Sequence, residues 1–195
     1  MKVLYIGLSL VSNRWGRASP RKLHAEGRRL LRLLDRGHGG SGKIAVSAGG
    51  RPYFLDGHAD FSIAHSGHAV AAAYSPAKCR QTGKPCKVGC DIQYVHPNKS
   101  RKDIAESFFS PEEQRYIGLG ASPEEQRVRF YRIWALKECF LKMFGRSVFD
   151  IPQAPSFSDG ENLKNGSAFL RFSCCELETA VFERYILAVG VDITP

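Results

Sequence analysis

The pattern of apolar and polar positions predicts short strands near both ends of the chain and helices in its middle. Apolar runs bounded by turn residues predict strands over 1–9, 44–46, 53–55 and 88–95, a hairpin over 61–74, and a closing hairpin of 167–177 and 181–191. The first hairpin is expected to turn at Ser66-Gly67. This mixture of strands and helices is typical of an α+β protein.

Two segments carry the same signal for the start of a helix. Ser110-Pro-Glu-Glu113 and Ser122-Pro-Glu-Glu125 each place a serine at the cap, a proline in the first turn and a glutamate at the capping-box position. The second helix is expected to continue to Phe144, because Gly145 follows as a stop signal.

A further helix is predicted over 20–36, with leucines at helical spacing, Pro20 near its start and Gly37 at its end. Arginines occupy its other face and account for much of the formal net charge of +9, which arises from 28 Lys and Arg against 19 Asp and Glu. Such a surface predicts an anionic partner, which can be nucleic acid, a phosphate-rich cofactor or an acidic protein. A basic surface kept for solubility is the alternative.

Length and composition indicate an ordinary globular chain, with either one sizeable core or two small fused lobes in a single domain over 1–195. The chain is 43% hydrophobic, no linker or low-complexity segment divides it, and no apolar run approaches the roughly 20 residues of a membrane helix. Its six cysteines form no C-x-x-C pair. We therefore expect a soluble cytoplasmic protein with reduced thiols and no membrane partner. The segment 185–193 resembles Val88-Gly-Cys-Asp-Ile92, which indicates either two similar halves or a chance likeness of short strands.

Two carboxylates stand out as candidates for chemistry. Asp91 lies inside an apolar strand, where a charge is costly without a partner, and Gln93 shares its strand face. Trp134, Glu138 and Lys142 fall four residues apart and therefore share one helix face. Two carboxylates are a typical number for Mg²⁺. The alternatives are an edge-strand aspartate that faces water and an ordinary exposed Glu–Lys helix pair.

Two further residues suit phosphate binding. His65 lies at a strand end before a Ser-Gly turn, and Arg51 stands between two glycines and Pro52. Each is equally explained as an ordinary turn or surface-loop residue.

The order of these motifs resembles the 4′-phosphopantetheinyl transferases of the Sfp type. The resemblance covers roughly residues 20 to 150 and is carried by Gly-Arg-Pro-Tyr-Phe (50–54), Phe-Ser-Ile-Ala-His-Ser-Gly (61–67), Val-Gly-Cys-Asp-Ile-Gln (88–93), Phe-Phe-Ser-Pro-Glu-Glu (108–113) and Trp-x-x-Lys-Glu-x-x-x-Lys (134–142). It implies two similar α+β lobes related by a pseudo-twofold axis, about 1–95 and 96–195, with a coenzyme A cleft between them. It also implies a monomer.

The resemblance implies transfer of the phosphopantetheine arm of coenzyme A to a serine of an acidic apo-carrier protein, with release of 3′,5′-ADP and a need for Mg²⁺. By position, Asp91 and Glu138 would bind the metal, with Gln93 at the third metal position. Lys142 would act at the pyrophosphate, and Glu138 is the candidate base for the serine proton.

The same resemblance places Arg51 and His65 at the phosphates of coenzyme A. Arg28, with Arg21 and Lys22, is a candidate for binding the 3′-phosphate. Lys137 points about 100° away from Glu138 around the helix, so it is expected at most to support the site.

Two departures from the family pattern keep other functions open. Gln93 is neutral where many members have an acid, and Ala64 stands where a serine is usual. A non-catalytic protein that binds coenzyme A or a carrier is therefore one alternative. A basic nucleic-acid-binding protein is another, but the chain lacks a recognised binding signature, and that function leaves Asp91 and Glu138 unexplained. We expect no nucleic-acid partner.

Overall fold

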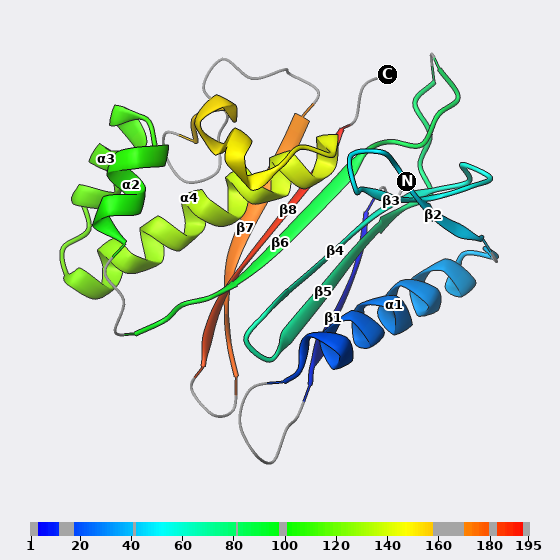
Figure 1. The fold of residues 1–195 in the computed structure, drawn as a ribbon, viewed down its shortest axis with the longest axis horizontal. Helices are drawn as coiled ribbons and strands as arrows, with labels where there is room; N and C mark the ends of the chain where they lie inside the picture. The colour runs from blue at the N-terminus through cyan, green and yellow to red at the C-terminus, as the bar shows by residue number, and fades with distance from the viewer. Residues whose placement is uncertain are drawn as a thin grey trace.

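The computed structural model describes residues 4–11, 18–40, 42–80, 82–97, 101–157, 170–179 and 183–192. Within these ranges the chain forms two three-stranded antiparallel sheets, and a long helix covers one face of each (Figure 1). A two-stranded ribbon and several short helices complete the structure. The predicted α+β class is therefore observed.

The first sheet has the strand order β1-β5-β4. Its strands are β1 (Tyr5–Leu10), β4 (Asp60–Ser66) and β5 (Ala69–Ser75), and its helix is α1 (Pro20–Gly37). The helix approaches the sheet closely at Gly27, where an added Cβ atom would stand 2.6 Å from Cγ2 of Ile63. Leu23, Leu30 and Leu31 are buried on this face of α1, which leaves the arginines on the opposite side exposed.

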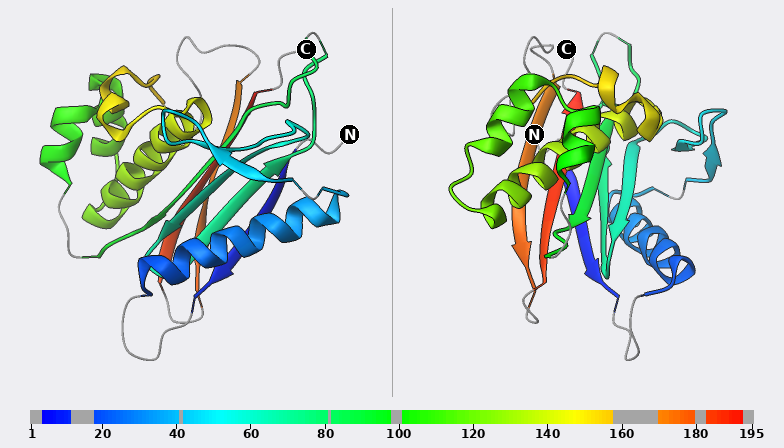
Figure 2. Two further views of the ribbon diagram at one scale, coloured as in Figure 1. Left: turned by 45° about the vertical axis from the view of Figure 1, so that its right-hand side comes forward. Right: turned by 60° about the vertical axis from the view of Figure 1, so that its left-hand side comes forward.

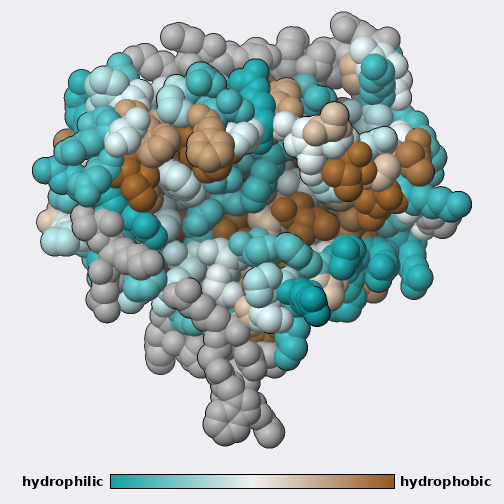
Figure 3. All heavy atoms as spheres, in the orientation of Figure 1, coloured by the Kyte–Doolittle hydropathy of each residue, from teal (hydrophilic) through white to brown (hydrophobic). Residues whose placement is uncertain are grey.

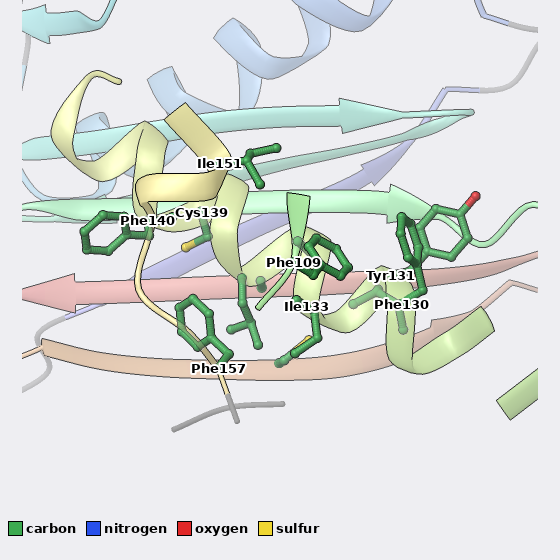
Figure 4. Packing of buried hydrophobic residues seen from close by; sticks show 14 of the residues in the cluster. Phe109, Phe130, Tyr131, Ile133, Cys139, Phe140, Ile151 and Phe157 are labelled. Atoms are coloured by element: carbon green, nitrogen blue, oxygen red, sulfur yellow. The ribbon is translucent and has the colours of Figure 1, made fainter. Parts of the chain in front are cut away.

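The second sheet has the strand order β6-β8-β7, and helix α4 lies across one of its faces (Figures 1 and 2). These elements are β6 (Val88–Tyr94), β7 (Leu170–Glu178), β8 (Arg184–Asp192) and α4 (Pro123–Phe144), with α2 (Lys102–Phe108), α3 (Pro111–Gly118) and the 3₁₀ helix η1 (Val148–Gln153) beside α4. A cluster of aromatic and aliphatic side chains fills the space around α4, including Phe109, Phe130, Ile133, Phe140 and Phe157 (Figure 4). This core holds α4 in a fixed position over β6.

The two sheets meet where β4 and β5 pack against β6. Small side chains make a close approach possible, because Ala64 and Ala71 from the first sheet share a buried cluster with Cys90 and Ile92 from the second. The ribbon of β2 (Ile44–Val46) and β3 (Pro52–Phe54) projects beside this junction, and a Cβ atom added at Gly49 in its loop would lie 3.1 Å from the carbonyl oxygen of Gly145. The junction therefore brings both halves of the chain to one place.

Most predicted boundaries agree with the structure within two residues. The first hairpin turns at Gly67-His68, one residue later than predicted, because Ser66 still pairs with Ala69. Gly67 has a φ of 57°, in the left-handed region that glycine adopts without strain. The prediction that Gly37 ends the first helix was wrong by one residue. Gly37 is the last helical residue, His38 is the cap, and the left-handed glycine is Gly39. The predicted strand ends in 1–3, 167–169 and 181–182 lie outside the described residues.

The two segments of similar sequence, 185–193 and 88–92, belong to neighbouring strands of one sheet. Strand β6 pairs with β8 in antiparallel register, with Gly89 opposite Gly190. The two segments therefore do not occupy equivalent places in two halves, and their likeness reflects a shared environment under α4. In the described part of the chain, no helix combines the length and apolar character needed to cross a bilayer.

Candidate active site

Gly89 lets helix α4 rest directly on strand β6. A Cβ atom at this position would stand 2.3 Å from the backbone carbonyl oxygen of Cys139, far inside contact distance. Cys139 follows Glu138 directly in α4, and Asp91 follows two residues after Gly89 on β6. Because Gly89 has no side chain, the helix face that carries Glu138 and Lys142 can lie close to the strand that carries Asp91.

Asp91 accepts a hydrogen bond at each carboxylate oxygen. The ammonium of Lys142 lies 2.5 Å from Oδ1, and the amide nitrogen of Gln93 donates to Oδ2 at 2.7 Å. The Asp91 side chain is only 3% exposed, so these two donors offset the cost of burying its charge. Burial works against the charge of Lys142, but the charge and hydrogen bond of Asp91 raise the pKa of that ammonium.

Glu138 lies beside this pair and is partly buried. Burial, and then the charge of Asp91, raise the pKa of the Glu138 carboxyl, while Lys142 opposes the change. Two carboxylates that repel each other, with an amide beside them, are a suitable donor set for a divalent cation with oxygen ligands. No group of three or more His, Cys, Asp or Glu side chains in the described ranges forms a cation site. A metal here would therefore depend on Asp91, Glu138 and the neutral Gln93.

His65 extends from the end of β4 beside the same group. Partial burial is the largest cause that lowers the pKa of His65, followed by His24 and Lys142, while Asp91 acts in the opposite direction. The ring of His24, from α1, lies 4.9 Å from that of His65. The predicted site residue His65 is thus brought to the Asp91–Lys142 pair, together with a histidine that sequence reasoning missed.

Arg51 donates hydrogen bonds to a buried carboxylate and to backbone carbonyl oxygens of three other elements. Its guanidinium forms a bidentate ion pair with Asp60, at 2.9 and 2.6 Å, and Nε donates to the carbonyl oxygen of Lys142 at 2.9 Å. Further bonds reach the carbonyl oxygens of Phe61 and Val88. Arg51 therefore ties the ribbon, β4, β6 and the end of α4 together. Sequence reasoning missed Asp60, although a buried acid at the start of an apolar strand signals a cationic partner.

A pocket of about 240 Å³ opens at this junction. Its walls come from the ribbon loop, from β4 and from the end of α4, and include Gly50, Arg51, Ser62, Ile63, Lys142 and Arg146. Lys142 lines the pocket with a side chain that is about one-third exposed, and its ammonium is held by the buried Asp91. Of the predicted site residues, Arg51 and Lys142 line this pocket, whereas Asp91, Glu138 and His65 are not among its lining residues. Asp91 is linked to the pocket by its ion pair with Lys142.

Arg28 is exposed on α1, one helical turn beyond His24. The same spacing places it on the flank of α1 that borders His65. Arg21 is three residues before His24 and shares this flank, whereas Lys22 points to another side of the helix. Arg28 therefore lies on the flank of α1 that borders His65, and its contact with a phosphate stays a prediction.

Lys137 faces away from Glu138, into the core beneath α3. Its ammonium lies 3.2 Å from Glu113, and both side chains are almost completely buried. Glu113 also accepts hydrogen bonds from the backbone amides of Ser110 and Phe157. Trp134 packs in the same region against Phe130. Both side chains stabilise the position of α4 and do not enter the pocket beside Asp91.

A second pocket, of about 630 Å³, lies between α2, α3 and the start of α4. It is lined by residues such as Arg101, Ala105, Ile117, Arg127 and Phe130, and by none of the predicted site residues. Its larger volume does not make it the candidate active site, because the paired carboxylates, Lys142 and His65 all lie at the junction of the sheets.

Comparison with known proteins identifies the family of this chain. The sequence model of the 4′-phosphopantetheinyl transferase superfamily matches residues 87–190, which is more than half of the chain and includes Asp91, Glu138 and Lys142. Among curated proteins, the chain is 31% identical to 4′-phosphopantetheinyl transferase AcpT of Salmonella typhimurium over 129 residues, which are 66% of this chain.

Two further relatives carry similar names. A 4′-phosphopantetheinyl transferase of Bacillus subtilis is 37% identical over 109 residues, or 54% of this chain, and 4′-phosphopantetheinyl transferase HetI of a Nostoc species is 27% identical over 146 residues, or 70%. The matched regions span 59%, 42% and 57% of the AcpT, Bacillus and HetI proteins respectively. The chain thus corresponds to less than two thirds of each relative, and it belongs to the 4′-phosphopantetheinyl transferase superfamily.

Proposed function

We propose that this protein transfers the 4′-phosphopantetheine arm of coenzyme A to a serine hydroxyl of an apo-carrier protein and releases 3′,5′-ADP. The observation that carries this proposal is the convergence of Asp91, Glu138 and Lys142 where α4 lies on β6. This cluster supplies two acids and a cation beside a pocket. The reaction needs the same groups, since it moves a phosphoryl group between two oxygen atoms and removes a serine proton.

Asp91 and Glu138 are the residues that would hold Mg²⁺, with the amide oxygen of Gln93 as a weaker third donor. The fit rests on the donor set and on the environment of Glu138, whose pKa is raised first by burial and then by the charge of Asp91. A cation bound between the two carboxylates would relieve their repulsion. When bound, Mg²⁺ would neutralise negative charge that develops on the pyrophosphate during transfer.

Glu138 is the candidate base. In the transfer, the serine oxygen bonds to the β-phosphorus of coenzyme A, the bond from that phosphorus to the bridging oxygen breaks, and the bridging oxygen leaves with 3′,5′-ADP. The serine proton passes to Glu138 or to a water that Glu138 orients. A raised pKa makes this carboxylate a stronger base than an exposed glutamate.

Lys142 would stabilise the charge of the pyrophosphate. Its side chain lines the pocket and is about one-third exposed, and its length allows the ammonium to move from Asp91 toward a phosphate. His65 and Arg28 would contact the phosphates of coenzyme A. For Arg51, phosphate contact remains a prediction, and its bonds to Asp60 and to the Lys142 carbonyl support a positioning role as well.

Two similar lobes related by a pseudo-twofold axis would form the coenzyme A cleft. Topology supports this. In the first half β1 is followed along the chain by α1, β4 and β5, and β5 lies between β1 and β4 in the sheet. In the second half β6 is followed by α4, β7 and β8, and β8 likewise lies between β6 and β7. The boundary of about residue 95 that the resemblance implies falls after β6 (Val88–Tyr94), which belongs to the second sheet. Because the repeat begins with β6, we place the start of the second lobe at that strand.

The carrier is proposed to be an acidic protein of fatty-acid, polyketide or non-ribosomal peptide synthesis. The net charge of +9 supports an acidic partner, because opposite charges speed encounter. We also propose a monomer in the cytoplasm, in which one chain supplies both lobes and buried thiols such as those of Cys90 and Cys139 stay reduced.

Mass spectrometry tests the proposed activity. The protein is incubated with coenzyme A, Mg²⁺ and a panel of apo-carrier proteins, and we expect one carrier to gain the mass of a single phosphopantetheine. Absence of a mass gain on every carrier, with folded protein, would refute catalysis. Binding of coenzyme A without transfer would favour the alternative of a non-catalytic homologue, which the neutral Gln93 and the Lys142–Asp91 ion pair support.

A further inference from the structure

The turn between β4 and β5 is attached to the second sheet by three consecutive residues. Ser66 accepts a hydrogen bond at Oγ from the backbone amide of Tyr94, at 3.0 Å. The backbone amide of His68 donates to the hydroxyl of Tyr185 at 3.2 Å. Between them, Gly67 leaves room for this hydroxyl, because an added Cβ atom would stand 3.0 Å from it. The turn therefore lies directly against the end of β6 and the start of β8 (Figure 1).

The Tyr185 side chain is itself held in one place. It is 1% exposed, its ring centroid lies 5.4 Å from that of Tyr94, and its hydroxyl donates to Oε2 of Glu183 at 3.0 Å. Burial is the largest cause that raises the pKa of Tyr185 to about 12, so the hydroxyl stays protonated near neutral pH. It can therefore donate to Glu183 and accept from the His68 amide at the same time.

Strand β4 lies beside β6 in a fixed register, although the two strands belong to different sheets. Three hydrogen bonds join residues that are 28 positions apart, from the Val88 amide to Asp60, from the Cys90 thiol to the carbonyl oxygen of Ser62 and from the Tyr94 amide to Ser66. The last of these bonds involves the residue after His65 and the third residue after Asp91. Attachment of the turn thus fixes the end of β4 relative to Asp91.

His65 depends on this attachment for its position. The residue is exposed, and the surface over α1, which carries the neighbouring ring of His24, is largely hydrophilic (Figure 3). Apolar packing therefore does little to hold the His65 ring, and the backbone that leads into the turn must hold it instead. The charges of Lys142 and Asp91 both act on His65. A shift of the turn would change the distance from His65 to this pair.

We propose that Tyr185 is a positioning residue for phosphopantetheine transfer, which holds the β4–β5 turn on the second sheet and so keeps His65 beside the Asp91–Lys142 pair. This inference rests on the proposed function. The described residues that line the pocket of about 240 Å³ do not include Tyr185, so its hydroxyl acts through the turn and not by contact with substrate. Loss of the hydroxyl leaves the His68 amide without its acceptor and frees the turn to move from β8.

Calorimetric titration of the full chain with coenzyme A in the presence of Mg²⁺ tests this inference. Tyr185→Phe removes only the hydroxyl, and His65→Ala removes the imidazole. We expect Tyr185→Phe to weaken the binding of coenzyme A about fivefold, the effect of one lost hydrogen bond. In a protein that already carries His65→Ala, the same substitution should cause no further loss, because a residue that acts through His65 then has nothing to position. Ser66→Ala loosens the same turn, and we expect the same pair of results from it.

Tyr131→Phe is the matched control. Tyr131 is also buried, and its hydroxyl also accepts hydrogen bonds, but from Arg101 and not from the turn. This variant should lower the Tm and bind coenzyme A as wild type does. If Tyr185→Phe lowers the Tm without weakening binding, or weakens binding equally with and without His65, the inference is wrong while the proposed function stands. If wild type does not bind coenzyme A, the proposed function fails, and this inference fails with it.

Discussion

Gly89 of β6 lies against the backbone carbonyl of Cys139 in α4, at a separation that leaves no room for a side chain. This contact sets the distance between the strand that carries Asp91 and the helix that carries Glu138. The glycine of the Gly-x-Asp motif is therefore not needed for a turn. It permits close packing of a helix on a strand.

Gly89→Ala should therefore weaken both the fold and the site. The new methyl group would force α4 away from β6, at a typical cost of about 1 to 3 kcal/mol for an overpacked core. We expect a lower Tm and a larger loss of transfer activity, because Lys142 and Glu138 move relative to Asp91. Gly118→Ala is the control, since an added Cβ atom there contacts nothing within 4 Å. Equal Tm values for the two variants would contradict this account of Gly89.

The buried ion pair of Lys137 and Glu113 should contribute strongly to stability. Lys137→Met leaves Glu113 buried without its cation, which typically costs about 3 to 5 kcal/mol. Guanidinium unfolding measures the loss. Lys102→Met removes a lysine from an exposed helix pair with Glu106 and should cost less than about 1 kcal/mol. A similar small loss for both variants would show that the Lys137 pair is not a stabilising link.

Gln93→Glu should lower the stability of the metal-free protein and strengthen its binding of a metal ion. Gln93 now donates a hydrogen bond to Asp91, and a carboxylate there would repel Asp91 instead. We expect the Tm in EDTA to fall and the rise in Tm on adding Mg²⁺ to increase relative to wild type. Gln153→Glu, on the exposed surface of η1, should change neither value. An unchanged response of the Gln93 variant to Mg²⁺ would argue against a cation at Asp91.

His58 should make stability depend on pH. It lies between Asp35 and Asp56, at 2.6 and 2.5 Å. Burial acts to lower the pKa of His58, but the hydrogen bonds and charges of Asp56 and Asp35 raise it overall. A raised pKa stabilises the fold fully below the unfolded value of about 6.5, and this contribution is lost as pH rises through the folded value.

The Tm difference between wild type and His58→Gln should therefore be largest near pH 5.5 and shrink by pH 8.5. His68→Gln is a suitable control, because His68 contacts the carbonyl oxygen of Val11 and not a carboxylate. A Tm difference for His58→Gln that stays constant across this range would contradict the proposed charge on His58.

Local signals account for the elements that could be predicted from the sequence. Ser110 and Glu113 form a complete capping box, and Gly145 ends α4 in the left-handed conformation, both as predicted. Ser122 also caps its helix, but Glu125 accepts its hydrogen bond from Ala121 instead of from the cap residue. Helix α2 has no side-chain cap at Arg101, so the signal that predicts the other two middle helices is missing there.

Contacts between distant residues could not be predicted in this way. The partners Arg51 and Asp60, and Lys137 and Glu113, come together only when separate elements pack, and nothing in their local sequence specifies the pairing. His24 lies on a helix face whose neighbours depend on how α1 crosses β4. By contrast, Asp91 could be identified because an acid within an apolar strand is costly wherever the strand lies.

The central claim, that Glu138 acts with Asp91 in phosphopantetheine transfer, is tested most directly by the Mg²⁺-dependent rate of carrier modification. The initial rate is followed by mass spectrometry for wild type, Glu138→Gln and the exposed control Glu106→Gln, with folding checked by circular dichroism. We expect Glu138→Gln to lose at least about 100-fold in rate, as expected for loss of a general base, while Glu106→Gln keeps the wild-type rate. A folded Glu138→Gln protein that modifies the carrier at a rate near that of wild type would contradict the account.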